Sequence, residues 1–273
     1  MFYFFRLTLV LVITIVLATV IILLGLFDPH GKRVYLINQF WTWLILRIAG
    51  ISLKIRGLEN IDPGQQYIFM VNHQSNIDIP VLVQSLAHFQ LRLIAKKELL
   101  WVPLFGWAMW ATKHITVNRS DPNDAAKSLE RAKQRMAAGI SVVVFPEGTR
   151  SRNGKLLGFK KGGFLLALQS GKNIVPIIIN GSGQLLPSGD WRLRSGMPAG
   201  NTSACPVISM ITAPHASYRP LLTRPLLRSR KGAITNAPFA LFRKCAARTA
   251  ADRSSRSSMK LAHSPRTASR KLT

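Results

Sequence analysis

A histidine and an aspartate stand five residues apart in residues 72–78, which read N-H-Q-S-N-I-D. On a straight helix, side chains at that spacing are separated by roughly 140° around the axis, so His73 and Asp78 would not meet. They can meet if the segment is a turn that leads from a strand at 67–71 into a helix. The residues before Asp78 are typical of a helix start, and Pro80 is tolerated in a first turn. The spacing therefore allows contact only at a strand–turn–helix corner.

Contact between these two side chains would support proton transfer. A carboxylate on one imidazole nitrogen fixes the tautomer of His73, and the other nitrogen is then free to take a proton from a substrate hydroxyl. The sequence contains no G-x-S-x-G motif for an enzyme nucleophile, which suggests direct attack by that hydroxyl. On spacing alone, an aspartate that only caps a helix is the more common arrangement.

A second loop, residues 145–151 (F-P-E-G-T-R-S), follows a predicted strand at 141–145 and has the composition of an anion site. Gly148 permits a tight turn in which successive backbone N–H groups face an anion, and Arg150 can bind a phosphate through two parallel hydrogen bonds. Glu147 would bind a substrate hydroxyl or hold that arginine. The alternative is a solvent-exposed turn with an incidental arginine. Four more basic side chains follow, at Arg152, Lys155, Lys160 and Lys161.

These loops belong to a pattern of alternating strands and helices between residues 50 and 190, which predicts an α/β sheet. Several strand segments are apolar throughout, as in strands covered on both faces. The predicted strands are 52–56, 67–71, 92–95, 115–117, 141–145 and 174–179. The predicted helices are 79–87, 104–112, 125–138 and 163–170. Arg119 closes the strand at 115–117 and is a further candidate cation for the same pocket.

The N-terminal part of the chain predicts a membrane anchor at 1–33. A run of 21 residues, 7–27, carries no charged side chain, and a helix of that length spans roughly 30 Å, the thickness of a bilayer core. The alternative, a secretory signal peptide, has a shorter apolar region followed by a small-residue cleavage site. The next segment, 34–55, is apolar and rich in aromatic residues, which predicts an amphipathic or interfacial helix. A core helix of the following domain is the other interpretation of that segment.

Composition narrows the class of protein further. The 273 residues include 37 Lys and Arg against 11 Asp and Glu, a net charge of +26, and 48% of them are hydrophobic. That hydrophobic fraction excludes a disordered chain, and two cysteines exclude a disulfide framework or a cysteine-rich zinc module. The basic balance favours anionic partners: nucleic acid, anionic lipid or a phosphorylated substrate. Lys32 and Arg33, just after the apolar run, predict that the body of the protein is cytoplasmic.

Residues 197–273 differ from the rest in being strongly basic and without a clear period. They are rich in Ser, Ala, Pro and Arg, and Asp252 is their one acidic residue. We therefore expect a largely disordered tail with short helices at 220–227 and 237–247. Such a tail would bind anionic lipid, whereas nucleic acid is not expected because few aromatic side chains are present for stacking. A reading-frame shift near codon 196 is the competing hypothesis, and translation of the other frames tests it.

Four motifs together resemble the glycerolipid acyltransferase family, most closely the bacterial 1-acyl-sn-glycerol-3-phosphate acyltransferases. The family motif N-H-x4-D matches 72–78, and F-P-E-G-T-R-S matches 145–151 without exception. A strand closed by an arginine matches 115–119 in part, because the usual Gly-x-x-Phe start is missing, and an apolar V-P-I strand matches 175–177. The resemblance covers roughly residues 35–190. It implies an α/β fold with a mixed sheet flanked by helices, preceded by an N-terminal membrane helix or a two-helix membrane motif.

The resemblance also implies a reaction. His73 would be the general base and Asp78 its orienting partner, while the free 2-hydroxyl of lysophosphatidate attacks the thioester of acyl-CoA or acyl-carrier protein and gives phosphatidate. No metal or bound cofactor is implied. The catalytic domain would be 56–196, on the cytoplasmic side of the cell (inner) membrane. The residues implied to hold the phosphate and glycerol are Arg119, Glu147, Gly148, Thr149 and Arg150.

Two alternatives to this activity stay open on the sequence. In one, the acceptor is another lysophospholipid or glycerol 3-phosphate, since the motifs do not settle whether position 1 already carries an acyl chain. In the other, the protein is a non-enzymatic, membrane-tethered anion-binding protein that uses its basic tail. Trp and Met residues between 101 and 110 are interpreted as lining an apolar face or an acyl groove rather than binding a cofactor. His88 and His114 are interpreted as structural or surface residues.

Overall fold

The computed structural model describes residues 2–190, 192 and 207–210. The chain divides into two units, Met1–Pro220 and Leu221–Thr273, and every described residue belongs to the first. The helices expected at 220–227 and 237–247 lie outside the described residues, as does most of the expected tail at 197–273.

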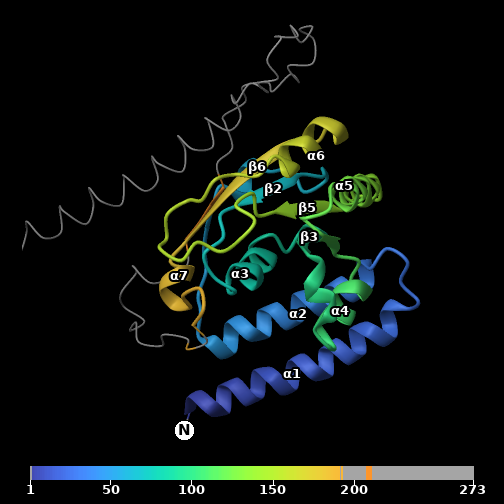
Figure 1. Ribbon diagram of the computed structural model, residues 1–273. Helices are drawn as coiled ribbons and strands as arrows, with labels where there is room; N and C mark the ends of the chain where they lie inside the picture. The colour runs from blue at the N-terminus through green and yellow to red at the C-terminus, as the bar shows by residue number, and fades with distance from the viewer. Residues whose placement is uncertain (1, 191, 193–206, 211–273) are drawn as a thin grey trace, which may run out of the picture. The chain divides into compact units, whose positions relative to one another are not determined.

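The described residues form a mixed seven-stranded sheet with helices packed on both faces (Figure 1). Its strand order is β1-β7-β6-β2-β5-β3-β4, and every pair of neighbours is parallel except β6 and β7. The predicted α/β class, a mixed sheet flanked by helices, is confirmed. The strands are β1 (Lys54–Arg56), β2 (Ile68–Val71), β3 (Leu91–Lys96), β4 (Ile115–Val117), β5 (Ser141–Val144), β6 (Ile174–Asn180) and β7 (Val207–Met210).

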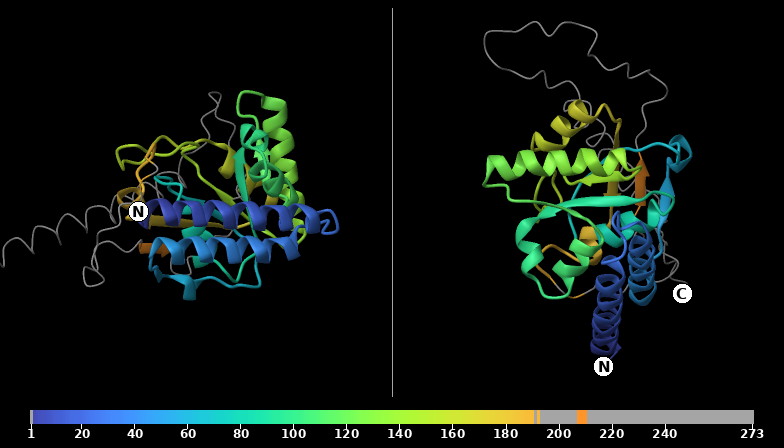
Figure 2. Two further views of the ribbon diagram at one scale, coloured as in Figure 1. Left: turned by 90° about the horizontal axis from the view of Figure 1, so that it is seen from below. Right: turned by 90° about the vertical axis from the view of Figure 1, so that its right-hand side faces the viewer.

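Helices α5 and α6 lie on one face of this sheet, and α1 to α4 lie on the other (Figures 1 and 2). The helix predicted at 125–138 begins three residues earlier, at Pro122, because the Asp121 carboxylate accepts the N–H of Asn123 and caps it. The α-helices are α1 (Phe2–Gly25), α2 (Lys32–Ala49), α3 (Asp78–Ser85), α4 (Phe105–Ala111), α5 (Pro122–Ala137), α6 (Gly162–Ser170) and α7 (Ser182–Leu185). The 3-10 helices are η1 (Leu58–Asn60) and η2 (Lys97–Trp101).

One strand is found where the sequence predicted none. Strand β7 lies within the segment expected to be disordered, and it pairs antiparallel with β6 and parallel with β1. Its Ile208 is fully buried in the main hydrophobic core. The strand is held by pairing with β6 and with the distant β1, which a local pattern does not reveal, so the expectation was wrong for this segment. The reading-frame hypothesis stays a prediction.

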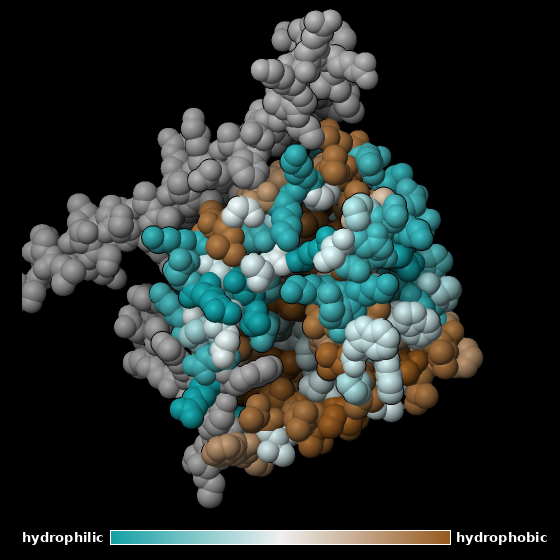
Figure 3. All heavy atoms as spheres, in the orientation of Figure 1, coloured by the Kyte–Doolittle hydropathy of each residue, from teal (hydrophilic) through white to brown (hydrophobic). Residues whose placement is uncertain are grey.

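Helix α1 is the one described helix that is long and apolar enough to cross a membrane, over Phe4–Gly25. It is tied to both neighbouring helices. Trp41 Nε1 of α2 donates to Thr14 Oγ1 at 2.9 Å, and a Cβ on Gly25 would lie 2.6 Å from the Cβ of Ala111 on α4. Much of the remaining apolar surface of α1 is exposed, along the lower edge of the molecule in Figure 3.

Helix α2 is amphipathic, as predicted for 34–55. Tyr35 and Leu46 are buried in the main core, whereas Leu36, Phe40 and Trp43 are exposed. Both sequence interpretations therefore describe part of this helix. Its inner face belongs to the core, and its outer face exposes apolar side chains together with Arg33 and Arg47. An interfacial position for its outer face stays a prediction.

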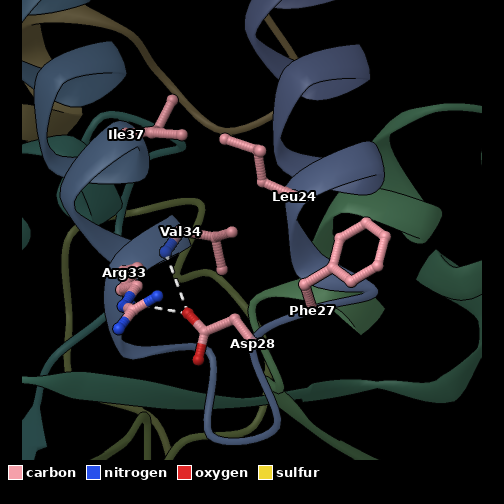
Figure 4. Close-up of a pocket in the computed structure, with 6 residues that line it drawn as sticks. All are labelled: Leu24, Phe27, Asp28, Arg33, Val34 and Ile37. Carbon is pink, nitrogen blue, oxygen red and sulfur yellow. Dashed lines mark hydrogen bonds between the residues drawn. The ribbon is translucent and has the colours of Figure 1, made fainter.

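The turn between α1 and α2 is closed by Asp28 (Figure 4). Its Oδ2 accepts the backbone N–H groups of Arg33 at 2.6 Å and Val34 at 3.1 Å, which caps the start of α2. The carboxyl group lines a cavity of about 150 Å³ together with the apolar side chains of Leu24 and Ile37. Burial alone would raise the pKa of Asp28, but the backbone hydrogen bonds outweigh it and lower that pKa.

A buried arginine attaches this turn to the sheet. Arg92 of β3 is fully buried, and its Nη2 donates to the carbonyl oxygens of His30 at 2.9 Å and Gly31 at 2.8 Å. Its guanidinium lies 5.0 Å from the ring centroid of the buried Tyr35, a cation–π contact. Burial lowers the pKa of Arg92 to about 10, so the side chain is still charged at neutral pH.

We expect Arg92→Met to lower the free energy of unfolding by about 2 kcal/mol, because the turn carbonyls then stay buried without donors. For a chain of this size the thermal midpoint should fall by about 4–8 °C, measured by differential scanning fluorimetry in detergent. Arg56→Met is the matched control, because Arg56 is exposed on the edge strand β1. Equal midpoints for the two variants would show that the arginine does not hold the turn.

Candidate active site

The two predicted loops leave neighbouring strands at the same edge of the sheet. Strands β2 and β5 are parallel and paired, with Met70 opposite Val144. In parallel strands the carboxyl ends meet at one edge, which is where sites form in α/β sheets. The loops that follow Val71 and Val144 therefore begin side by side, although they are more than seventy residues apart in the sequence.

The first loop is anchored by the side chain of Asn72. Its amide donates to the carbonyl of Ile179 at 3.0 Å and accepts the N–H of Ile179 at 2.8 Å. The side chain thus extends the pairing of β2 with β6 by one step beyond the end of the strand. This positions the next residue, His73, and it is a function that the motif alone did not reveal.

The predicted contact between His73 and Asp78 is present. His73 Nδ1 lies 2.9 Å from Asp78 Oδ2, and the aspartate is fully buried at the first position of α3. The same oxygen accepts the backbone N–H groups of Gln74 at 2.7 Å and Ser75 at 2.8 Å. Asp78 therefore closes the turn before α3 and holds the imidazole. Its hydrogen bonds to backbone go to residues that precede the helix, so the alternative of an aspartate that only caps a helix does not describe it.

The imidazole of His73 is held from a second side by the other loop. Its ring stacks on the ring of Phe145, with centroids 4.1 Å apart and planes inclined by 20°. Its backbone N–H donates to Glu147 Oε1 at 2.9 Å, and its carbonyl accepts the N–H of Ser151 at 2.8 Å. The ring keeps 15% of its side-chain surface exposed, so it is confined in position but accessible.

Glu147 joins the two loops through the backbone. Besides accepting the N–H of His73, its carboxylate accepts the N–H of Leu157 at 2.9 Å through Oε2. Burial raises its pKa, and these two hydrogen bonds lower it in part. The sequence predicted a contact with a substrate hydroxyl or with Arg150. Within the described part of the chain, the hydrogen bonds of Glu147 go to these backbone groups and none to that arginine.

A cationic cleft of about 270 Å³ lies at the same edge of the sheet. Of the predicted residues, Arg119, Gly148 and Thr149 line it, whereas Glu147 and Arg150 are not among its walls. Arg119 donates from Nη1 to the carbonyl of Gly148, and burial lowers its pKa. The full lining is Lys96, Glu98, Val117, Arg119, Ser120, Gly148, Thr149 and Lys160.

The sequence analysis did not single out Lys96. This lysine is the last residue of β3, much as Arg119 comes shortly after the end of β4. A basic residue at the end of a second apolar strand was the available signal. Lys160 was noted only as a basic neighbour of the loop, yet its side chain lies beside Gly148. A Cβ at Gly148 would lie 2.9 Å from Lys160 Cε and 3.0 Å from Arg119 Nη1, and the backbone φ there is +74°. Glycine is therefore required both for the turn and for the approach of the two cations.

Comparison with known proteins shows which family this fold resembles. Residues 52–180 match the family model described as Acyltransferase, and this part of the chain belongs to that family. It is 36% identical over 173 residues to the 1-acyl-sn-glycerol-3-phosphate acyltransferase of Pseudomonas aeruginosa, an alignment that covers 62% of this chain and 66% of that protein. It is 35% identical over 197 residues to such an enzyme of Chlamydomonas reinhardtii, covering 70% of this chain and 57% of the relative.

The fold is also similar to that of a solved acyltransferase structure. The chain superposes on the 1-acyl-sn-glycerophosphate (LPA) acyltransferase PlsC of Thermotoga maritima with a TM-score of 0.58 and 27% sequence identity, covering 77% of this chain and 86% of that one. The chain spans only about half to two thirds of the length of the curated relatives that it matches.

We expect Gly148→Ala to lower the thermal midpoint by about 2–8 °C, because a left-handed backbone costs a residue with a Cβ about 1–2 kcal/mol. The new methyl group must also displace Lys160 and Arg119. Gly158→Ala is the matched control, since a Cβ there meets nothing within 4 Å. A midpoint that stays with the control would mean that the loop accommodates a side chain at position 148.

Proposed function

We propose that this protein transfers a fatty acyl group from an acyl thioester to the 2-hydroxyl of 1-acyl-glycerol 3-phosphate and so forms phosphatidate. The observation that carries the proposal is the pair of His73 and Asp78, joined by hydrogen bonds to the F-P-E-G-T-R-S loop. A cationic cleft at the same edge of the sheet supplies the phosphate site. The named relatives, all acyltransferases for this acceptor, support the same reaction.

In the proposed reaction, His73 Nε2 takes the proton of the 2-hydroxyl while the hydroxyl oxygen attacks the carbonyl carbon of the thioester. Asp78 accepts the hydrogen bond of Nδ1–H, which leaves Nε2 unprotonated and stabilises the imidazolium that forms. The tetrahedral intermediate then expels the thiolate, which takes the proton back from Nε2. An ester and a free thiol result, and the enzyme regains its starting protonation state.

The phosphate of the acceptor binds in the cleft, where Arg119, Gly148 and Thr149 contact it. Two ammonium groups, Lys96 and Lys160, add positive charge to the same walls, which suits an anion with more than one negative charge. Glu147 acts as a positioning residue through the backbone of His73. Arg150 binds the phosphate or glycerol from the outer part of the same loop, where it is partly exposed.

The acceptor and the product are lipids, and the apolar helix α1 suits an enzyme that works on them. We place the anchor at 1–33, the interfacial segment at 34–55 and the catalytic domain at 56–196, on the cytoplasmic side of the cell (inner) membrane. Acyl-CoA or acyl-carrier protein is the donor, which reaches the domain from the cytoplasm. Within this proposal the protein has no nucleic-acid partner and requires no metal or bound cofactor.

We expect His73→Ala to lower the rate of phosphatidate formation at least about 100-fold, the contribution of a positioned general base. The assay supplies lysophosphatidate and labelled acyl-CoA to purified membranes, with protein amount and insertion checked by immunoblot. His88→Ala is the matched control, because His88 is exposed and away from the two loops. If the variant keeps the wild-type rate, His73 is not the base.

The same assay separates the alternatives when it offers several acceptors. If glycerol 3-phosphate or another lysophospholipid is acylated in preference to lysophosphatidate, that compound is the acceptor and the proposed acceptor is wrong. Absence of acyl transfer to any acceptor, with both acyl-CoA and acyl-carrier protein as donors, would favour the non-enzymatic alternative. Deletion of residues 211–273, which spares strand β7, would then remove anion binding, whereas His73→Ala would not.

We expect Glu147→Gln to lower kcat with little change in the KM for lysophosphatidate. A glutamine side chain has one acceptor oxygen for two backbone N–H donors, so the His73 or the Leu157 hydrogen bond is lost. Thr149→Val, at the wall of the cleft, is the comparison and should raise KM instead. A rise in KM at unchanged kcat for Glu147→Gln would mean that the carboxylate contacts the acceptor directly.

A further inference from the structure

Aromatic and aliphatic side chains are displayed on the outside of η2 and α4. Trp101 is 83% exposed, and Trp107 and Trp110 are each 55% exposed. The sequence predicted that this segment lines an apolar face or an acyl groove, and the exposure of its tryptophans agrees with the first of these. We call the exposed set the tryptophan patch; it consists of Leu99, Trp101, Val102, Phe105, Trp107 and Trp110.

The patch is built on a tightly constrained turn. Leu104, at the start of α4, has a φ of +61°, a conformation that costs a residue with a Cβ about 1–3 kcal/mol. Gly106 packs so closely that a Cβ there would lie 2.3 Å from the carbonyl oxygen of Leu100. The exposed tryptophans are therefore carried on a segment whose backbone is constrained, and large exposed apolar patches mark interaction surfaces.

The patch adjoins the apolar surface of α1. The inner side of α4 packs on α1 through Ala111, which belongs to one buried cluster with Ile21 and Val34. The outer side of α4 carries Trp107 and Trp110, and the end of α1 next to it exposes Leu23 and Leu24. Figure 1 shows α4 beside α1, and Figure 3 shows hydrophobic surface along the lower edge of the molecule in the same orientation. The two apolar surfaces therefore form one continuous face.

Positive charge surrounds this face. Lys96 and Lys97 are exposed at the start of η2, and the ammonium of Lys113 lies 4.5 Å from the ring centroid of Trp110. Glu98 is the one acidic residue between positions 96 and 114. Tryptophan beside lysine is typical of the membrane–water interface, where the ring lies at headgroup level and the ammonium faces lipid phosphates.

We propose that the tryptophan patch docks into the headgroup region of an anionic phospholipid bilayer, as a second membrane contact in addition to α1. Its continuity with the candidate membrane helix and its lysine border together favour this occupant over a protein partner. The contact would fix the orientation of the domain on the bilayer, because two separate attachments remove the rotation that a single helix leaves free. The proposal concerns binding and does not depend on the acyltransferase activity.

The test uses the full chain with Cys205 and Cys245 replaced by serine and a single new cysteine carrying the environment-sensitive fluorophore NBD. The labelled variants are Trp101→Cys and Trp107→Cys in the patch. Leu168→Cys is the matched control, because Leu168 is also an exposed apolar residue, on α6 at the opposite face of the sheet. Each protein is reconstituted in vesicles of phosphatidylcholine, with or without phosphatidylglycerol, some of which carry brominated acyl chains. The unlabelled variants are checked for an unchanged thermal midpoint.

We expect the NBD emission of both patch variants to shift to the blue and to be quenched by brominated lipid, more strongly with phosphatidylglycerol, while the Leu168→Cys label stays at its aqueous wavelength. Lys97→Gln should reduce the effect of phosphatidylglycerol, and Lys54→Gln on β1 should not. Patch labels that remain aqueous in both vesicle types would overturn the proposal. A blue shift that appears in detergent and rises with protein concentration would also overturn it, since a second copy would then cover the patch.

Discussion

The site depends on one buried carboxylate, that of Glu147. It accepts the N–H of His73 from one loop and the N–H of Leu157 from further along its own loop. Burying an ionised carboxylate costs several kcal/mol, and two charge-assisted hydrogen bonds each return about 1.5–3 kcal/mol. The two quantities nearly cancel, so the arrangement adds little net stability. What it provides is position, because the backbone of His73 is tied to the loop whose Phe145 stacks on the imidazole.

Sheet topology makes that arrangement possible. Strands β2 and β5 are adjacent and parallel, so their following loops meet at one edge, and β3 and β4 bring Lys96 and Arg119 to the same edge. Each of these four strands contributes residues to the site that are distant in the sequence from those of the other three. The pair of His73 and Asp78 and the cationic cleft are therefore assembled by strand order, while the local sequence has only to provide a turn into α3 and a glycine at position 148.

The sequence was sufficient where the information was local. The alternation of strand and helix segments predicted the α/β class. The spacing of His73 and Asp78 restricted their contact to a turn that enters a helix. It was insufficient where the partner is distant: the hydrogen bonds of Asn72 to β6 and of Glu147 to His73 link residues 107 and 74 positions apart. Nothing in the composition of residues 96–110 distinguishes an acyl groove from an exposed patch, because both are apolar and aromatic. That difference depends on which side of α4 faces α1.

Strand β3 connects the turn between α1 and α2 to the site. Arg92, near its beginning, binds the turn between α1 and α2, and Lys96, at its end, lines the cleft. Four residues of extended strand measure about 13 Å, and β3 is paired with β5 and with β4, so this distance cannot change without breaking the sheet. The distance between the cleft and the turn that joins α1 to α2 is thus set by a rigid strand and not by a flexible linker. For the lipid acceptor proposed above, such a site would keep the cleft at a constant distance from the headgroups.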